Sequence, residues 1–460
     1  MLRMFSGTEM FLVVGVLLLL TLCGVHIAIA LGFTAAFGIY LMQGDIEVVK
    51  QFVSNTAYEA LRDYVFAVIP LFMLMGEFLA RCGAARDVFA LVNRGLGRMP
   101  GRLGIATIFA NAIFAFVTGV SIAAAAAFSR IAYPEMRRHG YDRGFALGCV
   151  AGSACLGMLI PPSVLMIVWG ILTEQSIGRL FLAGIVPGIL LVIFYSAYVF
   201  FVAFTDPNRL GEGKATQEKA STPSERGSEP EQGEEISLSM ASFSTLLVVA
   251  LVIGTLGGIW LGAFTPTEGA GVGAVGAMIV ALLRGLRLRG LMEVIVSVGR
   301  TSAPLLLLLI TAQLYSRVLS MTGITAAAKD LFVSSGLSPA MILVIMVGVW
   351  FVLGCLIDSI SIILLTVPVF APVAQAVGFD PLAFAIMGIV AIETGLLTPP
   401  FGILVFTVRA ALPQEKIPLA EIFRNSIPYW FCLLMLVLSL AIWPQIATWL
   451  PALAFANKAG

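Results

Sequence analysis

The stretch that decides the fold is GVSIAAAAAFSRIAYPEMRRHGYDRG at 119–144 with GMLIPPS at 157–163, because its pattern recurs later in the chain. The later copy reads IDSISIILLTVPVFAPVAQAVGFDPL at 357–382 and GLLTPPF at 395–401. Residue numbers differ by 238 throughout, without a gap. The matched pairs are Ser121/Ser359, Ile122/Ile360, Pro134/Pro372, Gly140/Gly378, Asp142/Asp380, Gly157/Gly395, Pro161/Pro399 and Pro162/Pro400. Gly and Pro dictate backbone shape, whereas chance alignment of apolar runs would match mostly Leu and Ala, so we predict an internal repeat.

The composition around this repeat is that of a chain dissolved in lipid. Of 460 residues, 59% are hydrophobic and 12% are charged, and the mean hydropathy is +1.01. A soluble domain has about 25% charged residues, so a soluble enzyme, a disordered chain and a disulfide scaffold are excluded. The net charge of +1 gives no indication of a nucleic-acid partner. Six scattered Cys and only two His make a thiol or histidine metal site an unattractive interpretation.

Twelve apolar runs are candidates for membrane helices, since a crossing helix needs about 20 mostly apolar residues. They lie at 5–24, 26–42, 65–80, 103–133, 144–172, 180–205, 243–262, 266–283, 300–318, 339–371, 381–409 and 425–449. Lipid offers backbone groups no other partner, so the predicted fold class is an all-α polytopic membrane protein. The first two runs are interpreted as retained spans that meet at Gly24, rather than as a cleaved signal peptide.

A polar segment divides the chain. Residues 206–242 contain eight acidic and four basic residues and almost no apolar ones, which is typical of a solvated linker. The predicted organisation is therefore a first repeat at 1–205, an acidic linker at 206–242 and a second repeat at 243–460.

The distribution of basic residues predicts that the two repeats are inverted. Positions 81–143 contain nine Arg, whereas the matching positions 319–381 contain only Lys329. Because positive loops stay in the cytoplasm, the same element lies on opposite sides of the membrane in the two halves. Inversion requires an odd number of crossings per half. The long runs 103–133 and 339–371 are therefore expected to be re-entrant hairpins, leaving ten crossing helices, periplasmic termini and a cytoplasmic linker.

Each hairpin precedes a span that is broken in the middle by Pro-Pro, within 144–172 and 381–409. Two prolines remove two backbone donors, which lipid tolerates only where the freed groups line a cavity or meet an ion. Paired broken helices in inverted repeats indicate the binding site of a secondary transporter. The simpler alternative is a pair of proline kinks that serve packing.

The hairpin tips supply the other candidate residues. The tips are Thr118-Gly119-Val120-Ser121 and Leu356-Ile357-Asp358-Ser359. Asp358 in an apolar context is a candidate functional acid, with capping of the following helix as the alternative. Ser121 and Ser359 are predicted either to cap their helices or to bind ions.

Three further acidic motifs complete the set of candidates. Glu393 is a second intramembrane acid, interpreted as a proton or cation site or as the partner of an Arg. Thr265 and Glu268 form a predicted capping box with Pro266 between them. Asp142 and Asp380 are expected to act in turns and caps, because inversion separates them too far to form a two-aspartate protease site.

Taken together, these motifs resemble the large membrane subunit of the TRAP transporters, the DctM-like permeases. The resemblance covers nearly the whole chain outside the linker. It is carried by YPEM at 133–136 and GY at 140–141, LGMLIPPSVLMIVWG at 156–170, LFLAGIVPG at 180–188, FTPTEGAGVGA at 264–274, PVFAPVAQAVGFDPLAFAIM at 368–387 and ETGLLTPPFG at 393–402.

The resemblance implies Na⁺-driven import of an organic acid such as a C4-dicarboxylate or sialic acid, with no other cofactor. It implies an elevator motion in a bacterial inner membrane, a small four-span membrane subunit and a periplasmic substrate-binding protein. It also implies two sodium sites. The first comprises Thr118, Val120, Gly157, Ile160 and Pro162, and the second Leu356, Asp358, Gly395, Thr398 and Pro400. Val120 departs from the hydroxyl-rich tip usual in the family and leaves the first site one hydroxyl fewer.

Other residues are candidates without an assigned site. Those expected near the substrate are Gly119, Ser153, Glu393 and Thr394. Arg317 and Arg409 are the candidates for binding a substrate carboxylate. Two alternatives remain to the binding-protein-dependent importer: a standalone sodium-coupled carboxylate transporter, and a membrane-embedded enzyme, for which no convergent nucleophile and base were found.

Overall fold

The computed structural model describes residues 5–97, 99–211 and 238–456, and every regular element within them is a helix. The first half contains α1 (Gly7–Leu22), α2 (Ile27–Gln43), α3 (Ile46–Arg62), η1 (Tyr64–Ala67), α4 (Val68–Arg81), α5 (Ala84–Gly95), α6 (Arg102–Thr118), α7 (Ser121–Arg138), α8 (Arg143–Ser153), α9 (Leu156–Leu159), α10 (Val164–Thr173), α11 (Ile177–Thr205) and η2 (Pro207–Leu210). The all-α prediction is confirmed. Most of the predicted 206–242 linker, Arg3, Arg98 and the extreme termini lie outside the described residues.

The second half contains α13 (Leu238–Leu261), α14 (Pro266–Leu283), α15 (Leu288–Thr322), α16 (Ile324–Ser334), α17 (Pro339–Gly354), α18 (Ser359–Ala376), α19 (Pro381–Gly395), α20 (Ile403–Ala411), α21 (Leu419–Ile442) and α22 (Gln445–Ala456). Seven helical segments of the described residues are long and apolar enough to cross a membrane: 64–81, 143–173, 177–205, 266–283, 288–322, 359–376 and 419–442. Every apolar run expected from the sequence coincides with helical structure.

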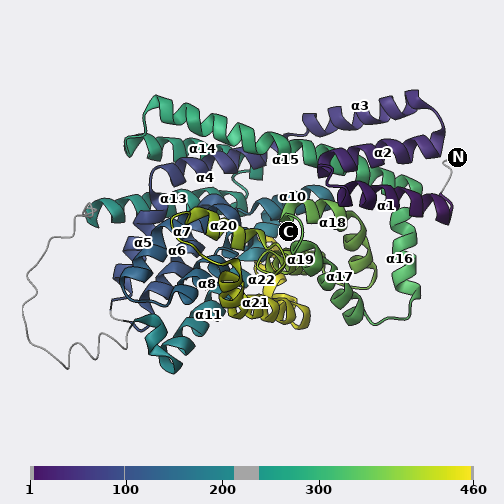
Figure 1. Cartoon of the computed structure of the whole chain (residues 1–460). Helices are drawn as coiled ribbons and strands as arrows, with labels where there is room; N and C mark the ends of the chain where they lie inside the picture. The colour runs from purple at the N-terminus through teal and green to yellow at the C-terminus, as the bar shows by residue number, and fades with distance from the viewer. Residues whose placement is uncertain (1–4, 98, 212–237, 457–460) are drawn as a thin grey trace, which may run out of the picture.

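The helices form two layers (Figure 1). The first layer contains α1–α4 and α13–α15, in which α15 packs against α2, α3 and α4. The second layer contains α6–α11 and α17–α22. Helix α5 leads from α4 of the first layer to α6 of the second, and α16 leads from α15 to α17.

Helices at matched positions of the two halves exchange partners. Helix α7 packs against α20 of the other half, while its counterpart α18 packs against α10, the counterpart of α20. In the same way α2 packs on α15 and α14 packs on α4, and α8 packs on α21 while α19 packs on α11. The second layer is therefore built jointly by both halves of the chain.

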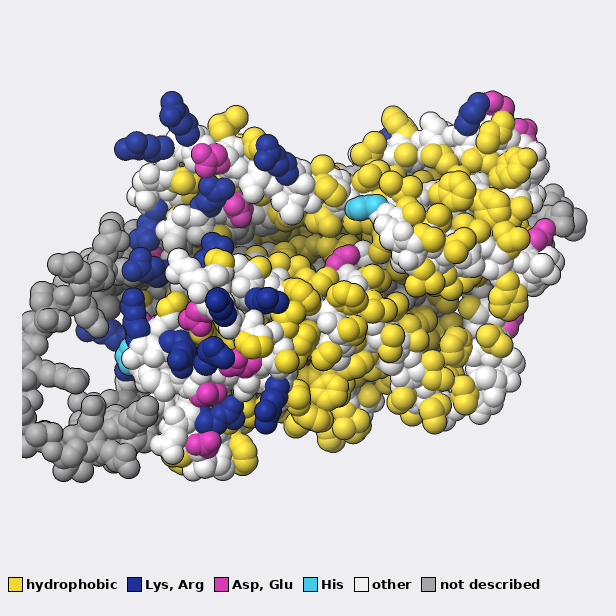
Figure 2. Space-filling view, in the orientation of Figure 1, with side chains coloured by type: hydrophobic (Ala, Val, Ile, Leu, Met, Phe, Trp, Pro, Cys, Tyr) yellow, Lys and Arg dark blue, Asp and Glu magenta, His cyan; other side chains and the backbone are white. Residues whose placement is uncertain are grey.

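Polar and apolar side chains divide the surface along the long direction of the molecule. Figure 2 shows most Lys and Arg side chains gathered toward one end of the molecule and a broad belt of hydrophobic side chains beyond them. Many of the apolar side chains in the chain are strongly exposed, among them Phe11, Leu22, Phe204, Leu261 and Leu283. An apolar belt of this kind suits contact with lipid tails.

Three helices and one predicted run differ from the sequence-based expectation. Helices α3, α5 and α16 were not expected, because they are too short or too polar to appear as membrane spans. The run at 425–449 is wrong as a single element: α21 begins at Leu419 and ends at Ile442, and α22 follows Pro444. A proline disfavours helical backbone at the residue before it, and Trp443, which precedes Pro444, has non-helical backbone (φ −125°, ψ 79°).

The predicted turns and caps are confirmed. Gly24 joins α1 and α2 with φ +77°. Asp142 accepts a hydrogen bond from the Phe145 backbone N–H, and Asp380 accepts from two backbone N–H groups at the start of α19. At the start of α14, Thr265 Oγ1 accepts from Glu268 N at 3.3 Å, and Glu268 Oε2 accepts from Thr265 N at 2.8 Å.

The capping box gives a test of local stability. Thr265→Ala removes the hydroxyl that satisfies an otherwise unpaired N–H of α14, and we expect it to destabilise the protein by about 1 kcal/mol. The measurement is the thermal unfolding midpoint in detergent. Thr267→Ala, in the same turn, removes a hydroxyl that is not part of the capping box and serves as the control. Equal midpoints for the two variants would contradict the stabilising role of the box.

Candidate functional site

The first hairpin tip is bonded to the first broken span through the backbone. Helix α6 ends at Thr118, Gly119 has φ +60°, and α7 begins at Ser121. The carbonyl of Gly119 accepts a hydrogen bond from the N–H of Val164 at 3.2 Å. A Cβ on Gly119 would lie 2.2 Å from the carbonyl oxygen of Pro162. Only glycine fits here, because it must adopt positive φ and leave room for another backbone.

The first break itself lies between α9 and α10. Ile160 has extended backbone, and Ser163 caps α10 by accepting from the N–H of Met166. A Cβ on Gly157 would lie 3.0 Å from the backbone nitrogen of Ser121. The structure therefore brings the predicted positions at 119–121 against those at 157–162. Thr118 contributes its backbone to the tip, and its hydroxyl donates to the carbonyl of Phe114 at 3.2 Å.

The second tip meets the second break in the same manner. A Cβ added to Gly354 would lie 2.7 Å from the Cα of Gly395, and a Cβ added to Gly395 would lie 2.6 Å from the Cα of Gly354. The N–H of Phe401 donates to the carbonyl of Cys355 at 3.3 Å. The hydroxyl of Thr398 donates to the carbonyl of Thr394 at 2.9 Å, and that of Thr394 donates to Val390. In the second half, the contacts therefore join the end of α17 at Gly354 and Cys355 to the break at Gly395 and Phe401.

The two assemblies differ in exposure. Residues 157–163 of the first break are all buried, whereas Pro399, Pro400 and Phe401 of the second are exposed. Leu356 at the second tip has 49% of its surface exposed and Phe401 has 54%. The second tip and break are therefore open on one side.

Asp358 is the N-cap of α18, as its capping alternative predicted. Its carboxylate accepts from the Ser361 N–H at 3.0 Å and from the Ser361 hydroxyl at 2.5 Å. The prediction that Ser121 and Ser359 act as caps is wrong. The N-cap residues are Val120 and Asp358, and each serine is the first residue of its helix.

The two serines instead converge on Glu393. Ser121 Oγ donates to Glu393 Oε2 at 2.5 Å, and Ser359 Oγ donates to Oε1 at 3.1 Å. Glu393 is 1% exposed, Ser121 0% and Ser359 5%. Of the two alternatives for Glu393, the one in which it pairs with an Arg is wrong for the described residues. Among the described residues, its carboxylate partners are these two hydroxyls.

Ser153 belongs to a separate buried pair. Its hydroxyl accepts from Asn111 Nδ2 at 2.7 Å and donates to the carbonyl of Cys149 at 2.6 Å. Asn111 was not singled out from the sequence. A polar residue within the apolar run 103–133 is the signal that could have identified it.

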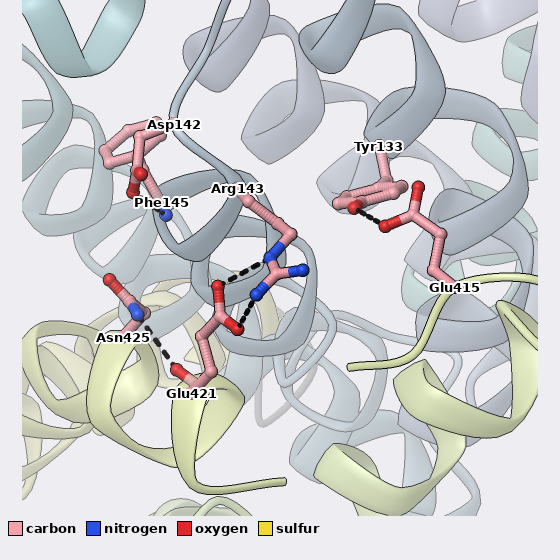
Figure 3. Close-up of polar contacts among 7 residues, drawn as sticks. All are labelled: Tyr133, Asp142, Arg143, Phe145, Glu415, Glu421 and Asn425. Carbon is pink, nitrogen blue, oxygen red and sulfur yellow. Dashed lines mark hydrogen bonds and ion pairs between the residues drawn. The ribbon is translucent and has the colours of Figure 1, made fainter. Parts of the chain in front are cut away.

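Polar contacts also join the two halves beside the first hairpin (Figure 3). Arg143 donates to both carboxylate oxygens of Glu421, at 2.8 and 2.5 Å, and Tyr133 donates to Glu415. Arg209 donates to Asn425 at 3.0 Å. Sequence reasoning missed these partners, although the excess of arginine at 81–143 called for acids elsewhere in the fold.

A cavity lies between the two layers. It has a volume of about 510 Å³ and is lined by residues of α3, α15 and the turn between α10 and α11, including Glu59, Gln175, Gln313 and Arg317. A neighbouring cavity of about 380 Å³ shares Gln175 and reaches α18 and α19. Arg317, one of the candidates for a substrate carboxylate, pairs with Glu59 at 2.7 Å. Arg409 lies near the end of α20, in a different cavity.

These features define a multi-pass helical membrane protein whose interrupted helices meet hairpin tips. The family described as "Tripartite ATP-independent periplasmic transporter, DctM component" matches residues 14–446. A C4-dicarboxylate TRAP transporter large permease protein of Pseudomonas aeruginosa is 34% identical over 92% of this chain and 93% of its own length. A sialic acid TRAP transporter large permease protein of Vibrio cholerae is 28% identical over 87% of this chain and 90% of its own length.

The chain therefore belongs to the DctM family of TRAP transporter large permease subunits. This confirms the resemblance, and because the family comprises transporters, the enzyme alternative is set aside. Among solved structures, the YdaH transporter of Alcanivorax borkumensis superposes with a TM-score of 0.62 at 14% identity. The match covers 95% of this chain and 99% of that one, and it supports the fold alone.

The contact between the first tip and the first break gives a test. Gly119→Ala would combine positive φ with a clash at Pro162, and αL backbone alone costs about 1–2 kcal/mol for an L-residue. We expect a sharp loss of monodisperse protein and a lower thermal midpoint. Gly271→Ala in α14, where an added Cβ meets no atom within 4 Å, is the control. If both variants behave like the unmodified protein, the close packing of tip and break is contradicted.

Proposed function

We propose that this chain is the permease subunit of a Na⁺-coupled importer that receives an organic acid from a periplasmic binding protein. The single observation that carries the proposal is the paired assembly of hairpin tip and Pro-Pro break. Freed carbonyls and half-helix ends at membrane depth are suited to cations, and half-helix N-termini to anions. Such backbone is tolerated in a membrane only where protein or a cavity surrounds it.

The proposed topology is two inverted repeats with ten crossing helices and two re-entrant hairpins. The exchange of partners between matched helices, such as α7 with α20 and α18 with α10, supports a two-fold relation between the halves. The gathering of Lys and Arg at one end of the molecule supports a cytoplasmic position for that end (Figure 2). Both termini are then periplasmic, in the inner membrane of a bacterial cell.

The proposed sodium ligands are the residues that tip and break bring together. The first site comprises Thr118, Val120, Gly157, Ile160 and Pro162, with Ser121 beside it. The second comprises Leu356, Asp358, Gly395, Thr398 and Pro400, with Ser359 beside it. Most of these groups can offer backbone carbonyl oxygens, and Asp358 adds a carboxylate, which suits a hard cation.

The transport step is proposed to be an elevator motion of the second layer against the first. The cavities between α15 and α10, α18 and α19 place polar side chains along that boundary. Gly119, Ser153, Glu393 and Thr394 are proposed to lie near the substrate. The relatives' names include carriers of C4-dicarboxylate and sialic acid, so we propose an organic acid as substrate. A small four-span subunit and a binding protein complete the proposed transporter.

Uptake into proteoliposomes tests this proposal directly. With the small subunit and the cognate binding protein present, we expect uptake of a labelled organic acid only under an inward Na⁺ gradient. A choline gradient of equal size is the control. Uptake that is indifferent to Na⁺ would refute the coupling, and uptake without binding protein would favour the standalone transporter.

A substitution at Asp358 can separate the role of its negative charge from its role as the N-cap of α18. Asn is as good an N-cap as Asp, so Asp358→Asn keeps the start of α18 while it removes a negative charge. We expect a several-fold higher Na⁺ concentration for half-maximal uptake and an unchanged thermal midpoint. Asp380→Asn, a matched change at the N-cap of α19, is expected to leave the Na⁺ dependence unchanged. Unchanged Na⁺ dependence in Asp358→Asn would assign that carboxylate to capping alone.

A further inference from the structure

Glu393 contacts both hairpins through its side chain. One oxygen of its carboxylate accepts a hydrogen bond from Ser121 of α7, and the other accepts one from Ser359 of α18. These serines occupy matched positions of the two halves, so one side chain joins equivalent points of both tips.

The repeat partner of Glu393 lies in contact with it but has different chemistry. That partner is Cys155, whose thiol donates to the carbonyl oxygen of Glu393 at 3.9 Å. Because these two matched residues contact each other, the two halves of the chain meet at this point. Since only one of the two positions is an acid, a single carboxylate serves both tips.

The surroundings make this carboxylate unusual. It is buried, and among the described residues it has no Lys, Arg or His partner. A buried anion needs compensation, because removal from water strongly disfavours a charge. Two hydroxyl donors and the N-terminal ends of α7 and α18 supply part of it. Cations at the neighbouring tips would supply more.

We propose that Glu393 couples the two sodium sites by tying the hairpin tips together, so that the sites fill cooperatively. The inference rests on the proposed function. Ser121 directly follows the backbone of Thr118–Val120, and Ser359 directly follows Asp358. A tip that shifts when its ion leaves moves its serine away from the shared carboxylate. The same displacement weakens the attachment of the other tip, so each ion favours binding of the other.

The experiment separates the bridge from the charge. The purified full chain is titrated with NaCl against choline chloride at constant ionic strength, and the rise in thermal midpoint is fitted for half-saturation and Hill coefficient. Uptake in proteoliposomes gives the same two quantities independently. Ser121→Ala and Ser359→Ala each remove one arm of the bridge, and Glu393→Ala removes both. Glu393→Gln keeps both arms, because an amide accepts from one hydroxyl and donates to the other.

We expect a Hill coefficient above one in the unmodified protein and a value of one in all three alanine variants. Glu393→Gln is expected to keep the cooperativity while half-saturation rises by about tenfold, since a nearby charge is lost. Ser129→Ala is the matched control: it removes a buried hydroxyl of α7 that bonds to Ala125 of its own helix, and no change is expected.

Each alternative result has a defined meaning. A Hill coefficient that stays above one in Glu393→Ala or in both serine variants overturns the coupling role, even if affinity falls. If Glu393→Ala does not yield monodisperse protein, the serine variants decide. An unmodified protein that shows neither Na⁺-dependent stabilisation nor Na⁺-dependent uptake refutes the proposed sodium coupling itself, which is a different failure from unchanged cooperativity in the variants.

Discussion

The structure depends on one constraint: a backbone group that leaves a helix within apolar surroundings must find a partner in the protein. Each hairpin tip and each Pro-Pro break exposes such groups, and each supplies what the other lacks. The carbonyl of Gly119 accepts a hydrogen bond from the N–H of Val164, and the carbonyl of Cys355 accepts one from the N–H of Phe401. Neither a hairpin nor a broken span would be stable alone at membrane depth, where an unpaired group costs several kcal/mol. The glycines at 119, 157, 354 and 395 follow from this, because two backbones can approach so closely only without a side chain between them.

Much of this arrangement could be predicted from the sequence, because glycine, proline and charge carry information that apolar residues do not. The Gly and Pro pattern alone predicts the interruptions at 157–163 and 395–401 and the tips at 118–121 and 356–359. The caps at Asp142, Thr265 and Asp380 were equally readable, since capping depends on neighbours within three residues. Long-range side-chain partners were not readable. Ser121 and Glu393 are 272 residues apart, and only the folded chain shows that they meet.

The errors have the same cause. Ser121 and Ser359 have the residue type of a helix cap, but the preceding Val120 and Asp358 take the cap position, so the hydroxyls are free to reach another helix. An Arg partner was one alternative for Glu393, yet it accepts hydrogen bonds from hydroxyl groups of two helices instead. Helices α3 and α5 were not predicted, because each is amphipathic with a large polar face and neither forms a long apolar run.

The departures from symmetry occur where the proposed chemistry needs them. The halves match in Gly and Pro, which set backbone shape, but differ at 155 and 393, where a thiol stands opposite a carboxylate. They also differ in exposure, since the first break is buried and the second is open. Identical halves would form two equivalent sites, each with its own acid and its own access. One shared acid and one open side would instead make the two proposed sites unequal and, under the proposed coupling, dependent on each other. Helices α7 and α18 directly follow the two tips, and they pack on α20 and α10. Displacement of either tip would therefore change packing against a helix of the other half. This cross-packing between the halves is what the proposed elevator motion of the second layer requires.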